Sequence, residues 1–172
     1  MTWIRKHKLY SRPQKPFDKT RIEEENVIIT SYGLKNKKEI WKAEAAVARI
    51  RRRAKKLITA NLEEQQELFK KLKRIGLKAE TIPDVLALDK KDWLDRKLQS
   101  IVFKKKLATT PKEARQLIVH KKISVEGHIV NQPSYLVETK QEGKIELAVK
   151  KKKKAAPREA VEASEKTEDN QE

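Results

Sequence analysis

Apolar residues recur at spacings of three and four along the first half of the chain, a pattern that indicates amphipathic helices. The most regular run predicts a helix that begins at Asn36, with Glu39 completing an asparagine form of the capping box. A mixed amphipathic stretch, residues 21–32, comes before it and is expected to end at Gly33 as a C-cap. The buried seam of the helix that begins at Asn36 is predicted to be Ile40, Ala43, Val47, Ile50, Ala54 and Leu57.

A further helix is predicted to begin at Asn61, with Glu64 in its first turn, and to stop at Gly76. Its many glutamates and glutamines favour packing against other helices over contact with a polyanion. After it, residues 82–84 (Ile-Pro-Asp) are expected to turn the chain into a brief apolar segment, 85–88, that joins two domains. The apolar stripe of the helix before Gly76 consists of Leu68, Phe69, Leu72 and Ile75.

Two more helices are predicted between residues 89 and 120. Asp89 and Asp92 favour a helix start, since a carboxylate near a helix N-terminus interacts favourably with the helix dipole. The apolar stripe that follows is Trp93 or Leu94, Leu98, Ile101 and Val102. The second helix starts at Thr110-Pro111-Lys112-Glu113, a capping box in which the threonine accepts an amide hydrogen bond and Glu113 reaches back. Its apolar face is Ala114, Leu117 and Ile118.

A small β-structure is predicted after these helices. Residues 123–125 and 129–130 flank Glu126-Gly127-His128, which is typical of a tight hairpin. One more strand is expected around residues 135–137. A turn at 142–144 is expected to lead into a closing strand through Ile145, Leu147 and Val149. The pattern therefore predicts an α+β protein in which a basic helical domain comes before a compact helix–helix–hairpin unit.

These elements suggest four regions along the chain. Residues 1–21 form a basic arm, which we expect to be extended, and residues 22–92 form an N-terminal helical domain. Residues 93–150 form the helix–helix–hairpin domain. Residues 151–172 carry six basic and six acidic residues with almost no large apolar groups, so a disordered tail is expected there. The arm is either a solvated tail or a segment whose aromatics stack on a partner.

The net charge of +17 on 172 residues requires a polyanionic partner. Nucleic acid is the first candidate and an anionic membrane surface the second. No apolar run reaches the roughly 20 residues that a membrane span needs. No signal peptide is recognised at residues 1–10, and the chain contains no cysteine. These observations favour a cytoplasmic protein without disulfides or thiolate zinc sites.

The positive charge is concentrated on two helical regions. Residues 35–56 hold ten lysines and arginines against two acids, and residues 96–122 hold nine against Glu113 alone. An ordinary solvated helix face mixes both signs, so phosphate contact is favoured over plain solvation, which stays open. On the first helix the cations outside the apolar seam are Lys42, Arg49, Arg52, Arg53 and Lys56.

The motif E-A-R-Q-L-x-x-H-K at residues 113–121, followed by V-x-G-x-x-V-N-x-P-S-Y-x-V at 125–137, resembles the RNA-binding domain of small-subunit ribosomal protein S-four. The block RIEEENVIITSYGLKNKKEIWKAEAAVARIRRRAKKL, residues 21–57, is similar to the N-terminal domain of the archaeal branch of that family. The resemblance covers roughly residues 10 to 150. A departure is Lys106, where archaeal members often have glycine.

The resemblance implies an RNA face on the second unit. It assigns that face to Arg96, Lys97, Thr110, Lys112, Arg115, Gln116, His120, Lys121, Asn131 and Ser134. Lys104 and Lys105, which lie outside the apolar stripe, complete the predicted RNA-binding set. We expect Arg115→Ala to weaken RNA binding with little loss of fold, because Arg115 lies off the apolar face. Ile123, Val125 and Tyr135 are interpreted as core.

The function that the resemblance implies is that of a structural protein of the small ribosomal subunit. It would bind small-subunit ribosomal RNA, nucleate assembly, contact small-subunit protein S-five and support decoding accuracy. A stand-alone S-four-domain RNA-binding factor is the alternative. A modifying-enzyme subunit and a DNA-compacting protein are further rivals.

No catalytic or small-molecule site is predicted. The three histidines, His7, His120 and His128, have no metal-ligand spacing, and no phosphate-binding glycine loop or nucleophile elbow occurs. We therefore expect no enzyme activity, metal, cofactor, small-molecule substrate or membrane partner.

Overall fold

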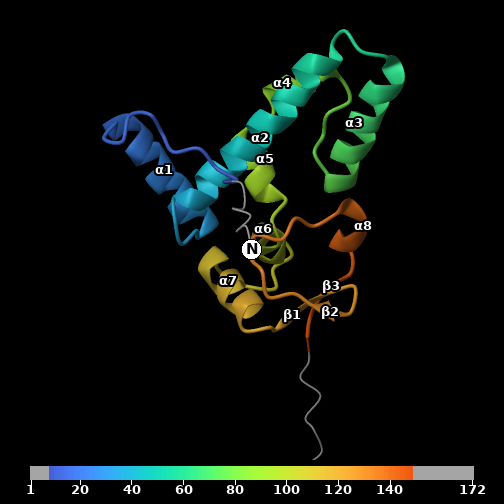
Figure 1. Ribbon diagram of the computed structural model, residues 1–172. Coiled ribbons are helices and arrows are strands. Elements are labelled where there is room, and N and C mark those ends of the chain that lie inside the picture. Colours follow the sequence, from blue (N-terminus) through green and yellow to red (C-terminus); the bar gives the residue numbers. More distant parts are fainter. Residues whose placement is uncertain (1–7, 149–172) are drawn as a thin grey trace, which may run out of the picture.

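The computed structural model describes residues 8–148 and shows helices followed by a small sheet (Figure 1). The helices are α1 (Lys19–Tyr32), α2 (Lys38–Leu57), α3 (Leu62–Ile75), α4 (Ile82–Ala87), α5 (Lys90–Asp95), α6 (Leu98–Lys104), α7 (Pro111–Val119) and α8 (Thr139–Glu142). The strands are β1 (Ile123–Val125), β2 (His128–Ile129) and β3 (Ile145–Leu147), which pair antiparallel in the order β2-β1-β3. The predicted α+β fold class is confirmed. The expected tail at 151–172, and Val149 of the closing strand, lie outside the described residues.

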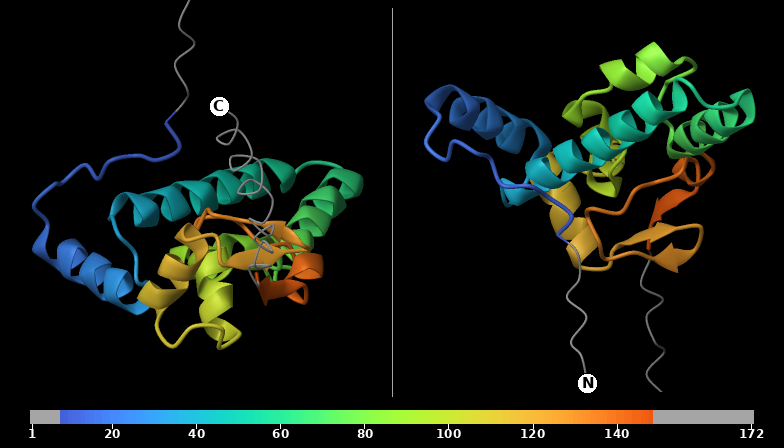
Figure 2. Two further views of the ribbon diagram at one scale, coloured as in Figure 1. Left: turned by 90° about the horizontal axis from the view of Figure 1, so that it is seen from below. Right: turned by 45° about the horizontal axis from the view of Figure 1, so that its top comes forward.

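The first half of the structure, residues 8–95, is built around α2. Its predicted seam is buried except for Ile50, which is partly exposed, and Ala46 joins it. The seam packs against α3, α4 and α5, and Figures 1 and 2 together show α3 turning back beside the C-terminal end of α2. Two buried apolar clusters result, and all members of both lie within residues 28–94.

The second half, residues 96–148, has a separate apolar core. Leu98, Ile101 and Val102 of α6 meet Ala114 and Ile118 of α7 and the inner face of the sheet. The other buried members of this cluster are Ala108, Ile123, Val125, Val137 and Ile145. The residues predicted as core on α6, α7 and β1 therefore pack together as expected, with Leu117 and Tyr135 at the edge.

The hairpin forms with a two-residue turn. Glu126 and Gly127 both adopt the left-handed conformation, with φ of 52° and 81°, as the tightest hairpin turn requires. Val125 pairs with His128 and Ser124 with Ile129. His128, expected in the turn, is therefore the first residue of β2. The closing strand predicted from Ile145 onward is confirmed as β3, which pairs with β1.

Several local predictions need correction. The stretch expected to form one helix after Asp89 is two helices, α5 and α6, because the chain extends at Lys97. That residue forms a single bridge with Leu136, which replaces the strand expected at 135–137. Leu98 N–H donates to the Tyr135 carbonyl at 2.8 Å and fixes this contact.

Two short helices lie where none was expected. The segment thought to join the domains is α4, whose N-cap Thr81 accepts from Asp84 N–H at 3.4 Å, while Asp84 accepts from Thr81 N–H at 3.0 Å. Helix α8 occupies the chain just before the predicted turn at 142–144. Helix α1 begins at Lys19, so the last residues of the expected extended arm are helical. The preceding segment lies against α2, with the rings of Tyr10 and Trp41 6.1 Å apart.

Four helices end in the same way, with a left-handed residue that lets two amides bond back to the helix. Gly33 ends α1 and Gly76 ends α3, as predicted. Lys106 and Lys121 occupy the equivalent positions after α6 and α7, each with φ of 58°. Lys106 N–H donates to the Phe103 carbonyl at 2.9 Å. At Lys106, where the sequence departs from the family resemblance, a lysine thus adopts a conformation that glycine takes at no steric cost.

Candidate nucleic-acid interface

The cations predicted on α2 lie at the surface. Lys42, Arg49, Arg52, Arg53 and Lys56 are all exposed. Lys42, Arg49, Arg53 and Lys56 are spaced by seven, four and three residues, which places them along one side of the helix. Arg51 differs, because its guanidinium donates to the Leu88 carbonyl and so ties α2 to the end of α4. Helix α2 therefore presents a row of cations that a phosphate backbone can approach.

A second exposed polar row starts at the N-terminus of α7. Thr110 accepts from Glu113 N–H at 3.2 Å, as predicted. Glu113 bonds to Thr109 and not to the Thr110 amide, so the capping box is only half formed. The exposed members of the predicted set here are Thr110, Lys112, Gln116, His120, Lys121, Asn131 and Ser134. Lys112 and Gln116, four residues apart, share one side of α7, and His120 continues this spacing at the C-cap of the helix.

Lys104 and Lys105 lie at the C-terminal end of α6. Lys104 is exposed and its ammonium pairs with Asp95 at 2.9 Å. Lys105 is partly exposed. Both remain available to solvent, although Asp95 offsets part of the charge of Lys104.

Lys97 was predicted at the RNA face, outside the apolar stripe, but the structure buries it. It is 6% exposed, and its ammonium lies 3.8 Å from a carboxylate oxygen of Glu39 on α2. Burial lowers the pKa of Lys97 below its ordinary value, and the nearby charges of Arg115 and Lys42 act in the same direction against the attraction of Glu39. This lysine has a partner inside the protein.

Arg96 was also predicted at the RNA face, and its guanidinium instead contacts three parts of the chain. It donates to the Ile75 carbonyl at 2.7 Å, to the Val137 carbonyl at 3.2 Å and to Glu142 at 3.1 Å. A Cβ placed on Gly76 would lie 2.6 Å from the guanidinium carbon. Gly76 is therefore needed both for its left-handed φ and for the approach of Arg96, which joins α3 to the second half.

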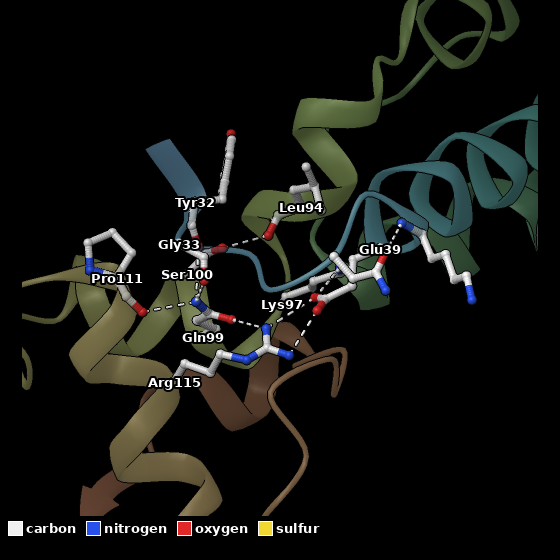
Figure 3. A network of polar contacts seen from close by, with 11 residues as sticks. Tyr32, Gly33, Glu39, Leu94, Lys97, Gln99, Ser100, Pro111 and Arg115 are labelled. Atoms are coloured by element: carbon white, nitrogen blue, oxygen red, sulfur yellow. Dashed lines mark hydrogen bonds and ion pairs between the residues drawn. The ribbon is translucent and has the colours of Figure 1, made fainter. Parts of the chain in front are cut away.

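Arg115 lies off the apolar face of α7, as expected, but its guanidinium is engaged. It donates to the two carboxylate oxygens of Glu39 at 2.8 and 3.3 Å and to Gln99 Oε1 at 3.2 Å (Figure 3). Glu39, assigned from sequence to a capping box, therefore serves the second half of the chain. The expected capping box is absent, since the Asn36 side chain accepts from Lys38 N–H at 3.0 Å and Glu39 does not reach back.

Gln99 is a residue that the sequence analysis did not single out. It is 3% exposed, and its amide nitrogen lies 3.0, 3.1 and 2.9 Å from the carbonyl oxygens of Tyr32, Gly33 and Pro111. Carbonyls only accept, so the amide nitrogen must face them and Oε1 must face Arg115. The available sequence signal was a glutamine inside the apolar run of α6.

A buried carboxylate, Glu25, holds α1 against the start of α2. It is 4% exposed and accepts from Arg21 at 2.8 Å and from the Trp41 indole at 2.9 Å, with the Lys37 ammonium at 3.5 Å. Burial alone would raise the pKa of Glu25, but the Trp41, Arg21 and Lys37 contacts bring it below the ordinary value. The site is structural and pairs with two cations that stay partly exposed.

Residues 8–148 hold no candidate metal site and no candidate membrane span. No three histidine, aspartate or glutamate side chains gather there as possible metal ligands. No helix in the same range combines the length and apolar character needed to cross a bilayer. The chemistry that the described surface does offer is phosphate neutralisation by exposed cations, with polar side chains beside them.

Comparisons with known proteins agree with this picture. The S4 domain family matches residues 96–142. The small ribosomal subunit protein uS4 of Thermoplasma acidophilum is 48% identical over 148 residues, which cover 81% of this chain and 74% of the relative. The protein of the same name from Korarchaeum cryptofilum is 43% identical over 149 residues, covering 83% and 90%. That from Methanoregula boonei is 40% identical over 155 residues, covering 84% of each chain. At these levels of identity and coverage, the chain belongs to the small ribosomal subunit protein uS4 family.

Proposed function

We propose that this protein is a structural component of the small ribosomal subunit and binds small-subunit ribosomal RNA directly. Its relatives carry the name of a small ribosomal subunit protein, and the match spans most of both chains. This extent does not favour a stand-alone RNA-binding factor. The protein therefore acts by holding RNA in place, in the cytoplasmic small subunit, and not as an enzyme.

The observation that carries the proposal is the exposed cation row of α2 together with the exposed polar row of α7. Both are free to meet phosphates, and folded RNA is recognised mainly through its backbone and shape. We assign the RNA contacts of the first half to Lys42, Arg49, Arg52, Arg53 and Lys56. Those of the second half are Lys104, Lys105, Thr110, Lys112, Gln116, His120, Lys121, Asn131 and Ser134.

The two halves serve as two RNA-binding domains in this proposal. We set the boundary between them at Arg96 and not at residues 92–93, and the packing of Trp93 and Leu94 in the apolar clusters of the first half supports this choice. Contact with the small-subunit protein S-five remains part of the proposal. A groove between α1 and α6, with Val27 68% and Phe103 40% exposed, offers apolar surface for a protein neighbour.

The test is a binding titration at near-physiological salt with excess unrelated tRNA as competitor. The probe is a transcript of the 5′ part of an archaeal small-subunit ribosomal RNA. Tight binding that survives the competitor is expected. Binding that tRNA displaces would contradict a specific ribosomal role and favour a general basic protein.

Salt dependence provides the residue-level readout. Each phosphate contact releases counterions, so Arg49→Ala and Arg53→Ala should each lower the slope of log K against log salt by about 1. Lys71→Ala is the matched control, since Lys71 is exposed on α3 and outside the proposed interface. If Arg49→Ala and Arg53→Ala keep the slope of the wild type, as Lys71→Ala is expected to, α2 is not part of the interface.

A further inference from the structure

The two halves of the protein are joined by polar contacts and not by a shared apolar core. Among the described residues, the two clusters of the first half contain no buried member beyond Leu94, and the cluster of the second half starts at Leu98. Between packed domains without a large hydrophobic interface, relative motion is the default expectation. Polar side chains must therefore set the geometry between the halves.

Four of these side chains form one connected group, which we call the polar bridge: Glu39, Lys97, Gln99 and Arg115 (Figure 3). Glu39 comes from α2, Gln99 from α6, Arg115 from α7, and Lys97 from the extended link before α6. One carboxylate oxygen of Glu39 lies 2.8 Å from the Arg115 guanidinium, and the other lies 3.8 Å from the Lys97 ammonium. Their side chains are 14%, 23% and 7% exposed in the order Glu39, Arg115, Lys97. Water therefore screens these charges less than at an open surface.

Gln99 extends the polar bridge to the end of α1. Its amide reaches the carbonyls of Tyr32 and Gly33 on one side and of Pro111 on the other. A Cβ on Gly33 would lie 2.9 Å from the Lys112 backbone nitrogen. The absence of a side chain at Gly33 thus lets the end of α1 touch the start of α7, and Gln99 closes the contact.

Both proposed RNA-binding rows start beside the polar bridge. Lys42 lies on α2 three residues after Glu39 and is close enough for its charge to act on Lys97. Lys112 and Gln116 flank Arg115 on α7. The polar bridge therefore lies between the cation row of α2 and the polar row of α7, and it acts beside the contacts that Arg96 makes between the halves.

We propose that Glu39, Lys97, Gln99 and Arg115 are positioning residues that hold the two RNA-binding helices in one fixed arrangement before RNA arrives. This inference rests on the proposed function. Its ligand is a folded RNA that offers phosphates to α2 and α7 at the same time. With the arrangement fixed, RNA that is bound to one helix meets the other helix at a high effective concentration. RNA binding then does not have to supply the free energy of fixing the two halves relative to each other.

The free protein provides the first measurement. The chain has no cysteine, so Ala48→Cys and Gln132→Cys, two exposed positions on opposite halves, accept a pair of nitroxide labels. Double electron–electron resonance then gives the distance distribution between the halves. One narrow distribution is expected for the otherwise wild-type protein, and it should stay unchanged when the ribosomal RNA transcript is added.

The variant that opens the polar bridge is Glu39→Gln, which keeps the side-chain shape and removes the charge that holds Lys97 and Arg115. Its matched control is Glu44→Gln, an exposed position on the same helix that changes the net charge equally. Glu39→Gln should broaden the distribution of the free protein and weaken transcript binding about 10- to 100-fold relative to Glu44→Gln. Both measurements are made at a temperature at which circular dichroism shows all variants to be folded. If Glu39 contributed only to the stability of the fold, the distance distribution and the affinity for the transcript would then be unchanged in Glu39→Gln.

Arg115→Lys is the second variant if Glu39→Gln does not fold. It keeps the net charge, but it loses the two-pronged contact with Glu39, so broadening and weaker binding are again expected. A narrow distribution in these variants with control-like affinity would overturn the proposal, as would a wild-type distribution that narrows only on RNA binding. If tRNA displaces the ribosomal RNA transcript from the wild-type protein, the proposed function is contradicted. The distances measured without RNA would still decide whether the polar bridge fixes the halves.

Discussion

The cations of α2 and those around the start of α6 look alike in sequence and differ in the structure. Both groups are clustered lysines and arginines beside an apolar stripe. On α2, Arg49, Arg52 and Arg53 stay exposed. Near α6, Arg96 and Lys97 turn inward, where they contact backbone carbonyls and carboxylates of distant segments.

The difference teaches that charge density alone does not identify an RNA contact. A cation becomes structural when an acid or a free carbonyl from another element lies within reach. On α2 the seam faces the helices of the first half and leaves the opposite side in water. At residues 96–97 the helix is interrupted, and the side chains lie where the two halves meet.

Removing a structural cation should have the largest effect. Arg96→Ala leaves the Ile75 and Val137 carbonyls without their donor and removes one of the contacts of α3 with the second half, while Thr139 still donates to the Lys73 carbonyl. We expect a loss of about 3 kcal/mol in the free energy of unfolding, measured by urea denaturation. The matched change Arg52→Ala on α2 should stay within about 0.5 kcal/mol.

Equal losses for Arg96→Ala and Arg52→Ala would break the comparison between the two groups. A small loss at Arg96 with a large loss of RNA affinity would return this residue to the RNA face. The urea titrations and the RNA titrations should therefore be made on the same protein preparations.

Acid provides a second, smaller test, because it neutralises a buried carboxylate that holds two partly exposed cations. The pKa of Glu25 lies below its ordinary value of 4.5 in the folded protein. Glu25 therefore adds stability above pH 4.5, and this contribution is lost as the pH falls through the folded-state pKa. Glu25→Gln should cost about 1–2 kcal/mol at pH 7.

The difference between wild type and Glu25→Gln should then shrink as the pH is lowered below 4.5. Urea denaturation at a series of pH values measures it. A difference that stays constant down to strong acid would show that Arg21 and Trp41 do not depend on the charge of Glu25.

The smallest effect is expected at Lys106, an exposed cation that carries backbone strain. Lys106→Gly relieves the left-handed conformation and should stabilise the protein by roughly 0.5–1 kcal/mol. Thermal unfolding followed by circular dichroism measures the gain. A loss of stability in Lys106→Gly would mean that the lysine side chain makes a contact that outweighs the strain.

Gly127→Ala is the converse change, at another left-handed position where a Cβ meets open space. It should destabilise the protein by a similar amount.

Sequence reasoning predicted the parts of this protein that depend on neighbours a few residues away. The seam of α2, the stops at Gly33 and Gly76 and the turn at Glu126-Gly127 follow from periodicity and backbone geometry. Helix α4 was missed although Thr81 and Asp84 provide a cap. Helix α8, with four residues, is too short to leave a periodic signal.

The candidate interface was harder to predict, because the partners that Arg96 and Arg115 have within the protein lie far along the chain. Arg96 bonds to a carbonyl 41 residues away, and Arg115 to a carboxylate 76 residues away. A residue pattern carries no information on such pairs. Gln99 shows the same limit, since its role depends on three carbonyls from α1 and α7.

The 76-residue separation of Glu39 and Arg115 also has a consequence for synthesis of the chain. Glu39 leaves the peptide tunnel first and has no Arg115 to bind, so α1 and α2 can pack their apolar faces while the carboxylate stays in water. Closing a loop of this length costs about 4 kcal/mol of chain entropy. The polar bridge can therefore form only after Arg115 has been made, at a stage when every residue of the first half's apolar core, up to Leu94, has already been made.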